Sequence, residues 1–123
     1  MNTQYSETEK IDLSYMDLII DGDDEMKKEM LFILLNEPQE EIAALWQKVE
    51  NNDCDGIKKI CHKMKSTLAF VGNETLSDLN SEINQKADSK MITEELIALL
   101  STFENLFQQL LIQVKAEYEK LLV

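Results

Sequence analysis

His62 and the residues within one helical turn of it are the part of this sequence best suited to chemistry. His62 is the only histidine of the chain. Four lysines lie within four residues of it, namely Lys58, Lys59, Lys63 and Lys65. An imidazole nitrogen can attack phosphorus, and a nearby ammonium can stabilise the anionic group that the ring then carries. Phosphoryl transfer depends mainly on positioning and electrostatic stabilisation, so few side chains suffice for it.

The distribution of charge marks the same segment. The chain of 123 residues has a formal net charge of −12, which argues against nucleic acid or an anionic membrane as a partner. Residues 54–72 nevertheless hold one acidic residue and four lysines, a net charge of +3, between flanking segments with net charges of −10 and −5. All twelve basic residues are lysines, so no arginine fork is available for bidentate binding of an anion.

The segment that carries the histidine has the start and stop signals of one helix, from about residue 54 to residue 71. Asp53 can cap its first turn, and Gly72 can adopt the left-handed conformation that ends a helix. Cys54 and Cys61 are seven residues apart on this helix, so their Cα atoms lie about 10 Å apart. That separation is too long for a disulfide or for a metal ion shared with the histidine. We interpret both cysteines as small apolar residues.

A helical wheel places His62 on the solvent side of this helix. At about 100° per residue the apolar side chains form one arc, which contains Ile57, Ile60, Cys61, Met64, Leu68 and Val71. His62 falls roughly 140° from the centre of that arc, so it does not fit a satisfied core histidine. Ser66 and Ala69 are small and lie one and two turns further along, where the backbone of a partner could approach closely. The remaining alternative is an inert surface histidine beside solvating lysines.

The rest of the chain shows further helical stripes and no alternating strand pattern. The stripes cover residues 13–20, 26–34, 42–49, 76–87 and 96–121. Pro38 lacks a backbone N–H and disfavours α geometry at the residue before it, so a kink or break is expected near residues 36–38. Long amphipathic helices with short connections predict an all-α fold, an antiparallel four-helix bundle with the short first helix as an accessory. We expect residues 1–10 to be a flexible N-terminus and residues 11–123 to form one domain.

The sequence also indicates a compartment. No stretch approaches the roughly 20 consecutive apolar residues that a membrane-spanning helix needs. The first residues lack the basic start and apolar run of a secretory signal. We therefore expect a cytoplasmic protein with reduced cysteines.

The residues around His62 resemble the signature of histidine-containing phosphotransfer (HPt) domains. That signature reads approximately His-x-(Leu/Met/Ile)-Lys-(Gly/small), with a glycine further on. Here it stands as His62-Lys63-Met64-Lys65-Ser66, followed by Gly72. The layout is similar too, with Gly22-Asp23-Asp24-Glu25 before a helix, an interruption at Asn36-Glu37-Pro38 and Asn52-Asp53 before the histidine helix. The sequence departs from the pattern at Ser66, where glycine is common.

The resemblance implies a four-helix bundle with an exposed histidine midway along one helix. By that resemblance His62 is the phosphoacceptor and Lys65 stabilises the phosphoryl group. Lys58, Lys59, Ser66 and Ala69 are the residues expected at the docking surface. The partners implied are response-regulator receiver domains and a hybrid sensor kinase, with the chain itself a monomer. No intrinsic cofactor is expected, and Mg²⁺ would come from the receiver partner.

Other activities fit the sequence less well. Only three glycines occur and none belongs to a phosphate-binding loop, so autonomous kinase activity from ATP is not expected. A non-catalytic helical adaptor that docks response regulators without phosphotransfer remains the main alternative, although the His62–Lys65 pair favours the active form. The sequence gives little support to a third hypothesis, a hydrolase that uses His62 as general base, because no serine or cysteine nucleophile is evidently paired with His62.

Overall fold

The computed structural model describes residues 9–123, which form five helices and no strand. In chain order these are α2 (Ser14–Ile20), α3 (Asp24–Glu50), α4 (Cys54–Val71), α5 (Glu74–Ala87) and α6 (Glu94–Lys120). The all-α fold predicted from the sequence is therefore confirmed. Most of the flexible segment predicted for residues 1–10 lies outside the described residues, and the division of the chain at residue 10 stays a prediction.

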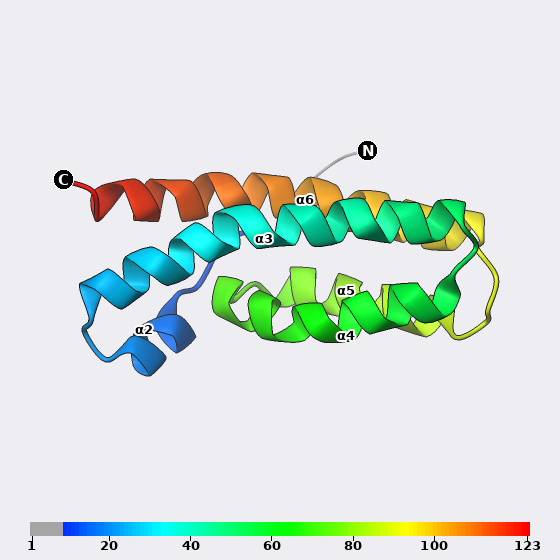
Figure 1. The fold of residues 1–123 in the computed structure, drawn as a ribbon, viewed down its shortest axis with the longest axis horizontal. Helices are drawn as coiled ribbons and strands as arrows, with labels where there is room; N and C mark the ends of the chain where they lie inside the picture. Colours follow the sequence, from blue (N-terminus) through cyan, green and yellow to red (C-terminus); the bar gives the residue numbers. More distant parts are fainter. Residues whose placement is uncertain (1–8) are drawn as a thin grey trace.

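The four longer helices lie side by side, and each packs against two of the others (Figure 1). Helix α4 packs between α3 and α5, and α6 also contacts both α3 and α5. The short α2 lies against α3 and α4. The inward faces form one cluster of buried apolar side chains, in which the rings of Phe103 and Phe107 meet edge to face. Burial of each large apolar side chain contributes about 1.5–3 kcal/mol, so this cluster is the main source of stability.

Side-chain caps set the starts of the four longer helices. In each case the capping side chain accepts a hydrogen bond from the backbone N–H three residues on. The capping residues are Asp23, Asp53, Asn73 and Thr93. At the other end of α4, Gly72 has a φ of 73° and ends the helix in the left-handed conformation. Helix α4 therefore has the bounds that the sequence predicted.

Of the kink or break expected near residues 36–38, the break is wrong, because helix α3 runs without interruption through Pro38. Figure 1 shows the axis of α3 changing direction partway along the helix, as a kink would produce. An interior proline costs about 3 kcal/mol of helix stability, but Pro38 is buried in the core. Two flanking amides also reinforce this turn. Asn36 and Gln39 each donate from the side chain to the backbone carbonyl four residues back, at 2.7 and 2.8 Å. Packing and these local bonds together outweigh the backbone preference.

The residues before α2 are fastened to the C-terminal end of α4. The backbone N–H of Asp12 donates to the carbonyl of Val71 at 2.9 Å. The side-chain nitrogen of Asn73 donates to the Glu9 carboxylate at 2.8 Å and to the Lys10 carbonyl at 2.9 Å. This segment therefore fixes the end of the helix that carries His62.

The substitution Asn73→Ala is expected to lower the free energy of unfolding by about 2–3 kcal/mol. Asn73 is 5% exposed and its side chain makes three hydrogen bonds, one of them to the N–H of Leu76. Loss of an N-cap alone costs about 1 kcal/mol, and the two bonds to residues 9 and 10 add to that. Urea unfolding measures the change. Thr93→Ala, which removes a cap bond alone, is the control, and an equal loss in both variants would contradict this role of Asn73.

Candidate functional site

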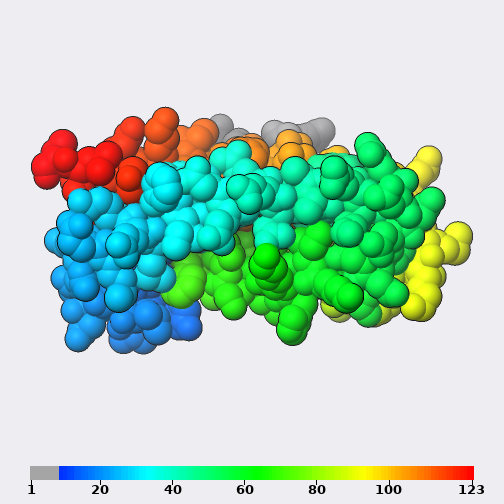
Figure 2. Space-filling view, in the orientation of Figure 1, coloured from blue at the N-terminus to red at the C-terminus, as the bar shows by residue number. Residues whose placement is uncertain are grey.

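His62 lies midway along α4 and is exposed, as the helical wheel predicted. The opposite face of α4 is buried through Ile57, Cys61, Met64, Leu68 and Val71, with Ile60 half-buried. Because that face is packed in the core, the helix cannot rotate, and the imidazole is held toward solvent. Figure 2 shows side chains of α4 (green) reaching the surface beside α3 (cyan). The site is therefore open to another macromolecule.

Two of the four lysines of α4 form ion pairs with residues outside this helix, and two do not. Lys58 forms an ion pair with Asp88, just after α5, and Lys63 forms one with Glu41 of α3 at 2.7 Å. The hydrogen bond and charge of Glu41 raise the pKa of Lys63 above its usual value. The other two lysines of the helix, at positions 59 and 65, are exposed and have no ion-pair partner within residues 9–123. These two are the free positive charges within one turn of His62.

Two hollows border this face of α4, one on each side. The α3-side hollow has a volume of about 140 Å³ and is lined by Met30, Ile33, Leu34, Ser66, Thr67 and Phe70. The α5-side hollow has a volume of about 240 Å³ and is lined by Lys65, Leu68, Ala69, Ser77, Asn80 and Ser81. Ser66 and Ala69 are both exposed, so the small residues predicted for docking lie at the rims of these two hollows.

Part of the surface beside Ser66 is apolar. Ile33, which lines the α3-side hollow with Ser66, belongs to the apolar stripe at residues 26–34 and yet is 44% exposed. Phe70 is half-buried, and its ring centroid lies 5.3 Å from that of Tyr15 in α2. The ring of Phe70 at the α3-side hollow is thus packed against an aromatic ring of α2.

Asn80 is a residue near the site that the sequence analysis missed. It is 2% exposed, and its side-chain nitrogen donates to the backbone carbonyl of Cys61 at 2.9 Å. Its Oδ1 atom is buried without a hydrogen-bond partner in the described structure. The signal in the sequence was a polar residue four positions after Leu76 and three before Ile83, on the core stripe of α5.

The buried cysteines do not supply a nucleophile. Cys54 and Cys61 are both free thiols. Burial raises the pKa of Cys61 to about 11, so this thiol is protonated at neutral pH and cannot attack as a thiolate. Over residues 9–123 no three His, Cys, Asp or Glu side chains are grouped as a metal site would require. His62 is an exposed side chain of α4 whose ring nitrogens can act as nucleophiles toward phosphorus.

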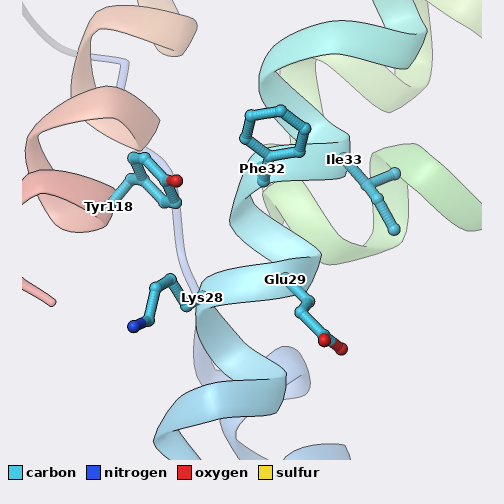
Figure 3. Close-up of a pocket in the computed structure, with 5 residues that line it drawn as sticks. All are labelled: Lys28, Glu29, Phe32, Ile33 and Tyr118. Carbon is cyan, nitrogen blue, oxygen red and sulfur yellow. The ribbon is translucent and has the colours of Figure 1, made fainter. Parts of the chain in front are cut away.

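A larger hollow lies between α3 and the C-terminal part of α6, and none of the predicted site residues lines it. Its volume is about 410 Å³, and Lys28, Glu29, Phe32, Ile33 and Tyr118 surround it (Figure 3). The rings of Phe32 and Tyr118 lie 6.1 Å apart, centroid to centroid. It offers no histidine or thiol for covalent chemistry.

Comparison with known protein families identifies a match over most of the chain. The sequence model of the Hpt domain matches residues 29–120, a span that contains all of α4, α5 and α6. No curated protein and no solved structure matches the chain. None of the helices within residues 9–123 combines the length and apolar character needed to cross a membrane.

Proposed function

The chain belongs to the Hpt domain family, and on that basis we propose that His62 is the residue that carries its phosphoryl group. Membership makes the chain a phosphotransfer domain of a two-component phosphorelay, which interacts with response-regulator receiver domains. In the proposal His62 takes the phosphoryl group from the aspartate of one receiver and passes it to another. The main observation in support of this proposal is that His62 is exposed on a helix whose opposite face is buried in the core.

Beyond an exposed and fixed histidine, phosphoryl transfer requires few other groups from the protein. A ring nitrogen of His62 attacks the phosphorus of an aspartyl phosphate, the N–P bond forms, the P–O bond to the aspartate breaks, and the carboxylate leaves. The second step reverses this with another receiver. Exposure matters because attacking and leaving atoms must approach in line. Lys65, one turn from His62 and without an ion-pair partner in the described chain, would donate to the phosphoryl oxygens. Mg²⁺ would be supplied by the receiver.

The proposed docking surface lies around His62 on α4. Ser66 and Ala69 allow close approach of a receiver, and Ser66 borders the apolar α3-side hollow, which can take an apolar side chain of the partner. Lys59 has no ion-pair partner among the described residues and would attract an acidic partner surface. Lys58 forms an ion pair with Asp88. Because its charge is already compensated, Lys58 would contribute less to docking than Lys59.

We also infer that α3, α4, α5 and α6 form an antiparallel four-helix bundle with α2 as the accessory helix. Two observations support it. Helices that follow one another along the chain also contact one another. The connections at residues 51–53, 72–73 and 88–93 are short, as antiparallel neighbours require. A monomeric state and a cytoplasmic location stay predictions.

The proposal is tested by incubating the protein with Mg²⁺ and a receiver domain that carries radiolabelled phosphate. We expect label to move to the protein, to be lost in acid but not in base, and to map to the peptide that contains residue 62. A hybrid kinase would enter only as the source of the labelled receiver. Binding of the receiver without any transfer would favour the alternative, a helical adaptor that docks response regulators.

The substitution Lys65→Ala is expected to slow this transfer about 10- to 100-fold and to leave the fold intact. A hydrogen bond to a charged group is worth about 1.5–3 kcal/mol, and each 1.4 kcal/mol corresponds to about a tenfold change in rate. Single-turnover transfer from saturating phosphorylated receiver gives the rate. Lys115→Ala is the control, since Lys115 is an exposed lysine of α6. Identical rates in Lys65→Ala and wild type would remove Lys65 from the mechanism.

A further inference from the structure

The amide of Asn80 joins α5 to the peptide group immediately before His62. Its Nδ2 donates to the carbonyl oxygen of Cys61 at 2.9 Å. That carbonyl and the backbone nitrogen of His62 belong to the same peptide group. In an α-helix the same oxygen also accepts the N–H of the residue four positions on, which is Lys65. A single buried side chain is thus bonded to a peptide group that contains the backbone nitrogen of His62 and accepts the backbone N–H of Lys65, the two residues proposed for phosphoryl transfer.

Stability alone does not account for an amide at this position. The Oδ1 atom of Asn80 is buried and has no donor among the described residues, and burial of an unpaired acceptor is unfavourable. The Cys61 carbonyl does not need Asn80, because the helical N–H of Lys65 already satisfies it. An apolar side chain of similar size would fill the space between α4 and α5 and leave no acceptor unpaired.

The position of Asn80 also relates it to the side chain of Lys65. Both residues line the α5-side hollow, together with Ser77 and Ser81 from the same face of α5. Asn80 therefore donates a hydrogen bond to the backbone carbonyl just before His62 and also lines the α5-side hollow together with Lys65.

We propose that Asn80 is a positioning residue for phosphoryl transfer. By holding the Cys61–His62 peptide group, it fixes the rotation of α4 against α5 and so the direction in which the His62 ring and the Lys65 chain leave the helix. Small displacements of reacting groups reduce the rate strongly, since the attack must be in line. Loss of the bond would therefore slow transfer without weakening receiver binding. This inference rests on the proposed function of His62.

The test compares Asn80→Val with Leu79→Ala. Valine is close to asparagine in size and has no donor, whereas Leu79→Ala opens a void at a residue of α5 that is 6% exposed. For Asn80→Val we expect a melting temperature at or above that of wild type and a maximal transfer rate reduced about tenfold. The receiver concentration at half-maximal rate should not change. For Leu79→Ala we expect a lower melting temperature and, at a temperature where it is folded, a maximal rate within about twofold of wild type.

A spectroscopic readout separates positioning from packing. The backbone amide resonances of His62 and Lys65 should shift in Asn80→Val and stay in place in Leu79→Ala. Asn80→Ala replaces the valine variant in both measurements if the latter does not fold. Transfer at the wild-type rate in the Asn80 variant, or equal slowing in Leu79→Ala, would overturn the inference while His62 remains the phosphoacceptor. A wild-type protein that takes no label overturns the proposed function, and this inference with it.

Discussion

Replacement of His62 by glutamine is expected to abolish labelling by a phosphorylated receiver domain and to leave the helical fold intact. The glutamine amide is not a nucleophile toward phosphorus, and the chain has no second histidine to take the place of His62. His62 is exposed, and substitutions at such surface positions change stability by no more than about 0.5 kcal/mol. Transfer of radiolabelled phosphate and thermal unfolding followed by circular dichroism measure the two effects.

Receiver binding supplies the control for this variant. Glutamine is close to histidine in size, and Ser66 and Ala69 are unchanged, so His62→Gln should bind the receiver with nearly wild-type affinity. A variant that binds and is not labelled separates the chemistry at residue 62 from docking. Undiminished acid-labile label in the variant would assign the phosphoacceptor to another residue. Weak binding with no label would instead indicate that His62 is part of the docking surface.

The local features of the site could be predicted because they depend on neighbours in the sequence. Asp53 and Gly72 mark the two ends of α4 through capping and a positive φ, which are properties of single residues. The exposure of His62 follows from helical geometry and the apolar arc on the other side. The all-α class follows in the same way from the 3–4 spacing of apolar residues along the chain.

The individual side-chain contacts between helices could not be predicted, because the sequence does not say which residues of two neighbouring helices meet. The charge count gives residues 54–72 a surplus of positive charge, but Asp88 from the connection after α5 and Glu41 from α3 pair with two of its four lysines. The bond from Asn80 to Cys61 likewise depends on the packing of α5 on α4.

Two local expectations were overruled by packing. Pro38 by its own chemistry predicts a kink or a break, and the helix continues through it without a break because its side chain is buried. Ile33 fits an apolar stripe and yet stands 44% exposed at the α3-side hollow. Such departures are informative, because an apolar side chain left exposed beside a candidate site favours a role in contact with a partner.

The substitution Gly72→Ala is expected to destabilise the protein by roughly 3 kcal/mol, the largest stability effect predicted here. Gly72 has a φ of 73°, and a residue with a Cβ costs about 1–2 kcal/mol in that conformation. A Cβ at this position would also clash with the backbone carbonyl oxygen of Asp12. Asp12 cannot yield freely, because its N–H donates to the carbonyl of Val71. Either that bond is lost or the last turn of α4 unwinds.

Gly22→Ala is the matched control, since Gly22 has a φ of 86° and no atom within 4 Å of an added Cβ. This variant measures only the cost of placing a residue with a Cβ in the left-handed conformation. Urea unfolding should show that the free energy of unfolding falls by about 1–2 kcal/mol. The further loss in Gly72→Ala measures how tightly residues 9–13 pack on the end of α4. Displacing this segment also displaces Tyr15, which supports Phe70 at the α3-side hollow. Gly72→Ala should therefore weaken receiver binding more than Gly22→Ala does, and equal effects of the two variants on stability and binding would contradict this packing.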